Sequence, residues 1–256
     1  MLLTVAHDFL PKTPTLRTTA VMGHFGIDFE QGRHALADDL PLDVRPGEVV
    51  SFEGPSGSGK SSLMRAAAAT LAKEAHVVNV DDLDLGDRPL VDALPGTVEE
   101  AMRLLGGCGL GEAHLMLRTP AELSEGQRYR FRLALALSRR PDWVVADEFT
   151  ATLDRTLARV VAGGVRRAAS RDGGSGFLIA TTHDDVWGDL RPDVRVRCDL
   201  GGDVSVTRPG DEPDADGSKK KADCSTSSGS VKPPRPTGRT SLGGITAATR
   251  SACYGS

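Results

Sequence analysis

The residues of this chain best suited to chemistry lie in one glycine-rich stretch, residues 54–62. The stretch fits the pattern G-x-x-x-x-G-K-[ST], in which successive backbone N–H groups surround phosphate oxygens. Lys60 can reach the outer phosphates as a point charge, and the Ser61 hydroxyl is a suitable ligand for Mg²⁺. The sequence therefore predicts a site for the phosphates of a nucleotide, formed by Gly54, Pro55, Ser56, Gly57, Ser58, Gly59, Lys60, Ser61 and Ser62.

The flanking segments are those that such a loop needs. Residues 48–53 are typical of a short buried strand, and residues 63–72 of an alanine-rich helix. The positive N-terminal end of that helix would add to the anion site. A flexible glycine loop without a ligand is the alternative, and the strand–loop–helix order favours the phosphate site.

Two neighbouring acids form a second candidate site. Residues 143–147 read as an apolar strand that finishes in Asp147 and Glu148. Alone, such a pair is as easily explained by solvation of a strand end. After a phosphate loop it indicates that Asp147 holds Mg²⁺ opposite Ser61, and that Glu148 activates a water molecule.

Between the phosphate loop and these two acids, residues 123–127, Leu-Ser-Glu-Gly-Gln, are typical of a helix start. Ser124 is a plausible N-cap, and Gln127 three residues later completes a capping-box pattern. The helix would continue over residues 128–138 and end before Pro141. Arginines 128, 130 and 132 could contact phosphate, but a solvated helix face is the favoured interpretation.

Strands alternate with helices after residue 48, which predicts an α/β fold with a mostly parallel sheet flanked by helices. We expect an antiparallel β region over residues 20–44, after an irregular entry with an edge strand. We also expect a short helical subdomain over about residues 97–138, with a break at residues 106–109. The predicted domain covers residues 1–207, and a Gly/Ser/Pro/Lys-rich tail, predicted to be disordered, covers residues 208–256.

Charge and cysteine content limit the possible functions. The tail carries 8 basic and 5 acidic residues, and the remainder carries 23 basic and 30 acidic residues. A folded part this acidic argues against a broad nucleic-acid-binding surface. The 4 cysteines lie far apart without a C-x-x-C pair, which argues against a zinc site or a disulfide framework and suits a cytoplasmic location.

Neither a signal peptide nor a membrane-spanning stretch is expected from the sequence. If the protein works at a membrane, another chain must supply the membrane part.

Taken in order, these motifs resemble the ATP-binding-cassette (ABC) ATPase family over roughly residues 25–207. The LSEGQ segment at residues 123–127, between the phosphate loop and the acidic strand, distinguishes this family, because other phosphate-loop NTPases lack it. The matching segments are GPSGSGKSS at 54–62, LSEGQ at 123–127, WVVADE at 143–148, ATLD at 151–154 and TTHD at 181–184.

The resemblance implies ATP as the nucleotide and a role for each matching residue. His183 resembles the histidine that contacts the γ-phosphate, although alone it would more often be an ordinary loop histidine. Ser124, Gly126 and Gln127 resemble the segment that touches ATP bound to a second subunit, and Asp154 the aspartate that couples the two sites. Phe25 stands where the family usually places an aromatic ring on adenine.

A homodimer follows from the same argument. The segment at Ser124 would be a second anion site, too distant from the phosphate loop of its own subunit to serve it. Two subunits facing head to tail can enclose two ATP molecules, so hydrolysis would loosen the pair and drive a conformational switch.

The sequence departs from the transport members of the family in two ways. They carry a hinge glutamine between the phosphate loop and the LSEGQ segment. The only glutamines in this sequence are Gln31 and Gln127, so Asp92 or Asp87 is a candidate substitute. The helical part is also short. It is similar to that of ABC-type ATPases found fused to acetyltransferase domains.

These departures favour a non-transport ATPase that acts on a soluble or nucleic-acid partner. The alternative is the nucleotide-binding subunit of a membrane transporter with a permease partner.

Overall fold

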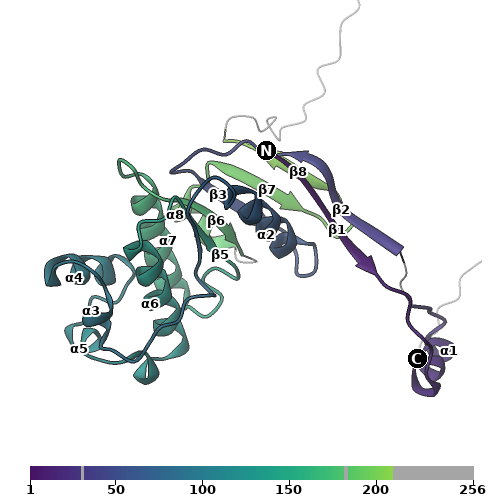
Figure 1. Ribbon diagram of the computed structural model, residues 1–256, viewed down its shortest axis with the longest axis horizontal. Coiled ribbons are helices and arrows are strands. Elements are labelled where there is room, and N and C mark those ends of the chain that lie inside the picture. The colour runs from purple at the N-terminus through teal and green to yellow at the C-terminus, as the bar shows by residue number, and fades with distance from the viewer. Residues whose placement is uncertain (30–31, 182–183, 210–256) are drawn as a thin grey trace, which may run out of the picture. The chain divides into compact units, whose positions relative to one another are not determined.

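The computed structural model describes residues 1–29, 32–181 and 184–209 of the 256 residues (Figure 1). Its strands are β1 (Leu2–Phe9), β2 (Gly32–Pro41), β3 (Val49–Glu53), β4 (Val77–Asn79), β5 (Trp143–Ala146), β6 (Gly176–Ala180), β7 (Val194–Cys198) and β8 (Val204–Thr207). Its α-helices are α1 (Leu16–Phe25), α2 (Lys60–Leu71), α3 (Leu90–Ala93), α4 (Val98–Gly107), α5 (Ala113–Met116), α6 (Glu125–Ser138), α7 (Arg155–Ala169) and α8 (Trp187–Leu190). Two short 3₁₀ helices are η1 (Pro120–Glu122) and η2 (Asp184–Val186).

The main sheet has six strands in the order β4-β5-β6-β3-β7-β8. All neighbouring pairs are parallel except β7 with β8. Because parallel strands need crossover connections, the helices between them cover the sheet. The predicted α/β fold with a mostly parallel sheet is confirmed.

The two faces of the sheet pack against different helices. In β5, Val144 and Ala146 belong to the apolar cluster that includes α4, α6 and α7, whereas Trp143 and Val145 belong to the cluster that includes α2. This alternation follows from the two-residue period of a strand. Strands buried on both faces explain why these segments read as continuous apolar runs.

The N-terminal region differs from the expectation. β1 and β2 form an antiparallel two-stranded sheet, as predicted in kind, but residues 16–25 are helical rather than extended. Thr15 caps α1 through a capping box with Thr18, and Gly26 ends it in the left-handed conformation (φ 65°). These end signals decided the local structure, and no residue of α1 is buried.

The helical part between β4 and β5 agrees with the sequence interpretation. α4 ends at Gly107 and α5 begins at Ala113, so the predicted break is present. Ser124 caps α6 through the predicted capping box with Gln127. The tail from residue 210 onward lies outside the described residues, so its predicted disorder and the domain boundary stay predictions. Among the described helices, none is both long and apolar enough to cross a membrane.

Asp193 connects three elements at the N-terminal edge of the sheet. Its Oδ2 accepts hydrogen bonds from the backbone N–H of Val49 at 2.8 Å and from the Arg166 guanidinium at 2.6 Å. Its own N–H donates to the Val49 carbonyl at 2.8 Å. The start of β3, the end of α7 and the start of β7 are thereby held together, which fixes the strand that leads into the phosphate loop.

We predict that Asp193→Ala lowers the free energy of unfolding by about 1–3 kcal/mol, because it leaves the buried N–H of Val49 without its acceptor. Urea unfolding measures the change. The matched control is Asp189→Ala, which removes the exposed ion pair with Arg159 and should have a much smaller effect. Equal losses in the two variants would contradict the role given to Asp193.

Candidate nucleotide site

The phosphate loop lies between β3 and α2, at the C-terminal edge of the parallel sheet. Gly54 has a φ of 138°, and a Cβ placed there would lie 2.1 Å from the carbonyl oxygen of Cys198. Gly59 has a φ of 90°, immediately before α2. Both positions therefore require glycine, which confirms that the glycines serve a defined backbone conformation.

The inside of the loop offers unused hydrogen-bonding groups. Lys60 is only 8% exposed, and its Nζ donates to the Pro55 carbonyl oxygen at 2.6 Å. The Ser58 hydroxyl is buried and has no hydrogen-bond partner among the described residues. Because buried polar groups are almost always paired, this orphaned hydroxyl fits a loop built around a polar ligand.

Ser61 and Asp147 meet across the sheet edge. The Ser61 Oγ donates to Asp147 Oδ1 at 2.9 Å, and the Arg65 guanidinium lies 3.2 Å from Asp147 Oδ2. A hydroxyl and a carboxylate oxygen are a donor set that suits Mg²⁺. The described residues contain no cluster of three or more His, Cys, Asp or Glu side chains that could hold a metal ion. The pair therefore fits a metal shared with phosphate oxygens and water rather than a closed protein site.

Glu148 follows Asp147 in an uncommon backbone conformation. Its φ is 46°, its side chain is exposed, and its N–H donates to Asp147 Oδ1 at 3.0 Å. The N–H of Phe149 donates to the carbonyl of Ala180 at 2.8 Å, which anchors this turn to the end of β6. Left-handed non-glycine residues are typical of functional turns, and here the conformation directs a carboxylate away from the core.

A cavity of about 640 Å³ lies over the loop and the two acids. Four of its lining residues come from the β1–β2 sheet: His7, Phe9, His34 and Leu36. The His7 Nε2 lies 3.1 Å from the Ser62 Oγ. The sequence interpretation missed these residues. Their signal was the two-residue spacing within each strand, which places His7 with Phe9 and His34 with Leu36 on a shared face.

The structure does not bring Phe25 to this cavity. Phe25 is the last residue of α1 and is 69% exposed, whereas Phe9 lines the cavity. The reason is the helix over residues 16–25, which replaces the strand that was expected to present Phe25. The predicted contact between Phe25 and adenine is not supported, and Phe9 is the aromatic residue in place.

The segment at Ser124 is exposed and does not line the cavity of its own subunit. The Ser124 Oγ accepts from the Gln127 N–H at 3.3 Å, and the Gln127 Oε1 accepts from the Ser124 N–H at 3.0 Å. A Cβ on Gly126 would lie 3.0 Å from the Thr152 carbonyl oxygen. The start of α6 therefore packs closely on the turn that follows Glu148.

Asp154 is the N-cap of α7, and its Oδ1 accepts from the N–H groups of Thr156 and Leu157 at 2.9 and 3.0 Å. The predicted coupling role of Asp154 is compatible with this capping role and stays a prediction. His183 lies outside the described residues.

The two residues considered as substitutes for the missing glutamine, Asp87 and Asp92, lie away from the cavity over the phosphate loop. Asp87 is exposed in the loop before α3, and Asp92 is exposed within α3. Neither lines the cavity over the phosphate loop. Asp81 lies two residues beyond the end of β4, and its pKa is raised first by partial burial and then by the charges of Asp147 and Glu148. The sequence interpretation overlooked Asp81 because position along the chain does not show which strands are neighbours.

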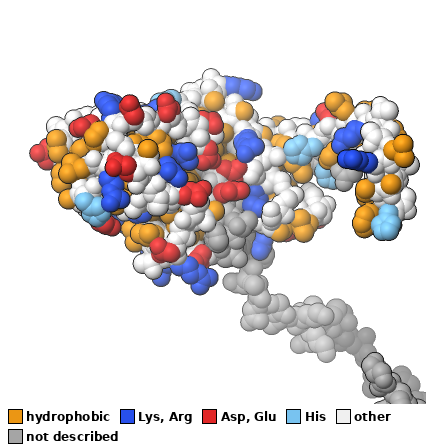
Figure 2. Space-filling view, turned by 90° about the horizontal axis from the view of Figure 1, so that it is seen from below, with side chains coloured by type: hydrophobic (Ala, Val, Ile, Leu, Met, Phe, Trp, Pro, Cys, Tyr) orange, Lys and Arg blue, Asp and Glu red, His pale blue; other side chains and the backbone are white. Residues whose placement is uncertain are grey.

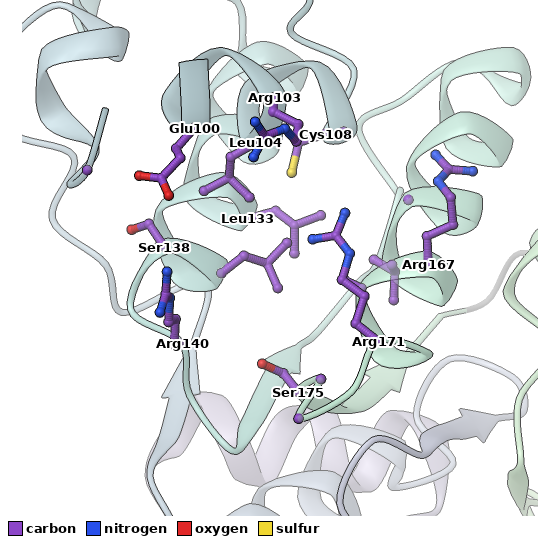
Figure 3. Close-up of a pocket in the computed structure, with 18 of the residues that line it drawn as sticks. Glu100, Arg103, Leu104, Cys108, Leu133, Ser138, Arg140, Arg167, Arg171 and Ser175 are labelled. Carbon is purple, nitrogen blue, oxygen red and sulfur yellow. The ribbon is translucent and has the colours of Figure 1, made fainter. Parts of the chain in front are cut away.

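A second cavity, of about 600 Å³, lies between α4, α6 and α7, away from the phosphate loop (Figure 3). Leu104, Leu133 and Leu137 give it an apolar lining. Arginines come from several sides, and Figure 3 shows Arg171 pointing into the middle of the cavity. The arginines are Arg103, Arg140, Arg167 and Arg171.

Burial raises the pKa of the Cys108 thiol, in the same lining, to about 12, so this cysteine is an unreactive core residue. Cys108 and Cys198 are both free and buried. On the face shown in Figure 2, acidic and basic side chains are interspersed, without a continuous basic patch.

Comparison with known proteins agrees with this geometry. A family sequence model described as "ABC transporter" matches residues 37–101. The lipoprotein-releasing system ATP-binding protein LolD 2 of Caulobacter vibrioides is 32% identical over an alignment of 188 residues, and the matched region spans 57% of this chain and 81% of LolD 2. The zinc import ATP-binding protein ZnuC of Roseobacter denitrificans is 33% identical over 145 residues, and the matched region spans 51% of this chain and 57% of ZnuC.

Among solved structures, the dimeric post-hydrolysis state of the ATP-binding cassette MJ0796, bound to ADP and Pi, matches with a TM-score of 0.52. The match covers 71% of this chain and 94% of that chain at 20% identity, so it shows a shared fold. The phosphate loop, the paired Ser61 and Asp147, and the similarity to LolD 2 together lead to one conclusion: the chain belongs to the ABC transporter ATPase family.

Proposed function

We propose that this protein binds ATP with Mg²⁺ and hydrolyses it at the edge of the sheet formed by the phosphate loop and the Asp147–Glu148 turn. The observation that carries the proposal is the 2.9 Å hydrogen bond between Ser61 and Asp147. It joins the loop that suits phosphate to the strand end that suits a metal. Lys60 then neutralises phosphate charge, and Ser61 and Asp147 hold the metal, which supplies electrostatic stabilisation of the transferred phosphoryl group.

Glu148 is proposed as the general base. Its carboxylate is exposed next to Asp147, and it lines the same cavity as Lys60 and Ser61. A base must lie within reach of the water whose proton it takes, and the left-handed backbone at Glu148 presents the side chain to that cavity. His183, as implied by the resemblance, would assist by contacting the γ-phosphate.

ATP is proposed to complete a homodimer. Ser124, Gly126 and Gln127 begin an exposed helix terminus and are absent from the cavity lining of their own subunit. Backbone N–H groups at such a terminus suit an anion. A second copy that faces head to tail would present them to the γ-phosphate, so each nucleotide would contact both subunits.

Glu148→Gln should reduce ATP hydrolysis by at least about 100-fold, because general-base catalysis contributes on that scale. Binding of ATP should persist, so size-exclusion chromatography with ATP and Mg²⁺ should show a trapped dimer. Glu74→Gln, an exposed change after α2, is the matched control and should turn over ATP normally. Only monomers for Glu148→Gln with saturating ATP would contradict the proposed dimer.

Phe9→Leu should weaken ATP binding roughly tenfold, because the variant keeps an apolar side chain but loses the ring that we expect to stack on adenine. Phe9→Tyr should bind as the parent protein does. Isothermal titration with a non-hydrolysable ATP analogue measures both. Phe25→Leu is the control and should have no effect, and the reverse order of effects would restore the role first expected for Phe25.

We infer that the partner is a membrane permease, so that the protein is the nucleotide-binding subunit of a transporter. The similar proteins LolD 2 and ZnuC are ATP-binding proteins of a lipoprotein-releasing system and of zinc import. They support the transporter alternative over a soluble or nucleic-acid partner, and over the acetyltransferase-associated group. Such a subunit would act at the cytoplasmic face of the membrane.

The arginine-lined cavity is the proposed contact surface for that permease. Its four arginines make no ion pair among the described residues, and its leucine lining suits an apolar side chain. A short segment of the permease that combines acidic and apolar residues would complement both features.

Purification of tagged protein from a detergent extract of its native cells should retain a membrane chain at a one-to-one ratio. Arg103→Glu with Arg171→Glu should abolish that retention by charge repulsion while ATP binding stays intact. The exposed change Lys73→Glu is the control. Retention of a soluble chain instead, sensitive to the same variant, would favour the soluble-partner function.

A further inference from the structure

Two charged side chains are buried among the residues that the structure describes, Lys60 at 8% exposure and Arg130 at 6%. Lys60 lies in the phosphate loop, where its charge suits a bound anion. Arg130 lies in α6, the helix that Ser124 caps. The solvated helix face expected for arginines 128, 130 and 132 is therefore wrong for Arg130. A buried guanidinium calls for an explanation, because arginine is almost never buried unless it is paired.

The Arg130 side chain is held by two backbone carbonyl groups. Its Nε donates to the Gly126 carbonyl oxygen at 3.1 Å, and its Nη1 donates to the Gly109 carbonyl oxygen at 2.5 Å. Gly126 belongs to the first turn of α6, whereas Gly109 lies in the break between α4 and α5. A Cβ on Gly109 would lie 3.3 Å from Nη1, so this glycine leaves room for the guanidinium. Arg130 thereby fixes the first turn of α6 against the preceding loop.

These contacts hold the guanidinium in place but leave its charge uncompensated. Among the described residues, no carboxylate forms an ion pair with Arg130. Glu125, the one acid in the first turn of α6, is exposed to solvent. The N-terminal end of the helix dipole is itself positive, so a cation beside the first turn is unfavourable unless an anion binds there. The start of α6 therefore combines two sources of positive potential.

We infer that Arg130 is a positioning residue for the anion site at Ser124: it fixes the first turn of α6 and adds buried positive charge beneath the γ-phosphate that a second copy presents. The inference rests on the proposed ATP-dependent homodimer and deepens it. Each nucleotide would face two buried cations, Lys60 of its own subunit and Arg130 of the second copy. The phosphate offsets the cost of burying the guanidinium, so Arg130 stabilises the dimer with ATP more than the single subunit.

A first test measures the dimer in the Glu148→Gln background, by sedimentation velocity with ATP and Mg²⁺. Arg130→Met removes the charge and keeps an apolar stem, and it should weaken dimerisation roughly tenfold, as expected for a charge at a helix N-terminus that meets an anion. Arg130→Lys keeps the charge and should recover most of the loss. Binding of ADP to the single subunit, measured by isothermal titration, should change less than about twofold in both variants.

The matched control for the first test is Arg139→Gln, which removes a charge from the exposed C-terminal end of the same helix. It should dimerise as the parent does. Arg130→Gln is a second variant without the charge, and it can still donate a hydrogen bond to one of the two carbonyl groups. It should show the same loss as Arg130→Met. If one of these two variants does not fold, the other still compares a neutral side chain with lysine.

A second test asks whether Arg130 acts on the nucleotide of the other subunit. With Glu148 intact, a mixed dimer of Arg130→Met and Lys60→Ala has one site with both cations, because each copy supplies what the other lacks. The mixture should hydrolyse ATP faster than the sum of the two variants measured alone. Lys60→Ala mixed with the double variant Lys60→Ala, Arg130→Met has no complete site and is the control. Absence of recovery in the first mixture would contradict action across the dimer.

The outcomes separate this inference from the proposed function. If the Glu148→Gln protein stays monomeric with saturating ATP, the proposed dimer fails and the inference fails with it. If that protein dimerises and Arg130→Met dimerises as tightly, the dimer stands and the inference alone is wrong. If Arg130→Lys weakens the dimer as much as Arg130→Met, the hydrogen bonds matter rather than the charge, and the inference is again wrong.

Discussion

The hydrogen bond between Ser61 and Asp147 is the constraint on which the rest of the structure depends. It can form only if two strands that are far apart in sequence end at the same edge of a parallel sheet, with a helix beginning at one end and an exposed turn at the other. The sheet order β4-β5-β6-β3-β7-β8 meets this condition by placing β6 between β3 and β5. The bond from the Phe149 N–H to the Ala180 carbonyl then sets the height of the turn that carries Glu148. Packing on both faces of the sheet holds these strand ends in place, so the geometry of the site depends on the two apolar clusters.

Much of this arrangement was readable from the sequence, and the reason is local. Gly54, Gly59, Ser124 and Gln127 act through backbone conformation and capping within a few residues, so their spacing predicts their geometry. What the sequence did not reveal depends on long-range pairing. Phe9 lines the cavity because β1 pairs with β2 on either side of a helix that was not expected. Asp81 stands next to Asp147 in register because β4 and β5 are neighbours. The α1 helix itself was signalled by the Thr15–Thr18 capping box, but short apolar runs between glycines favoured a strand interpretation.

The start and the middle of helix α6 lie in different surroundings. At its start, Ser124 is exposed and Gly126 packs against the turn after Glu148. Further along the helix, Tyr129 and Arg132 each carry a buried polar atom. One continuous helix, Glu125–Ser138, therefore joins an exposed start to a buried middle.

The same geometry limits what the partner can be. In the proposed dimer, a nucleotide-driven motion would reach the helical part through α6. The cavity between α4, α6 and α7 adjoins the far end of that helix through Leu133, Leu137 and Ser138. An acidic partner segment seated among Arg103, Arg140, Arg167 and Arg171 would feel any rotation of α6 directly. A nucleic acid would also favour arginines, but a cavity with a leucine lining does not match an extended phosphate backbone. The short helical part is therefore compatible with the proposed permease, whose contact segment would be short and acidic.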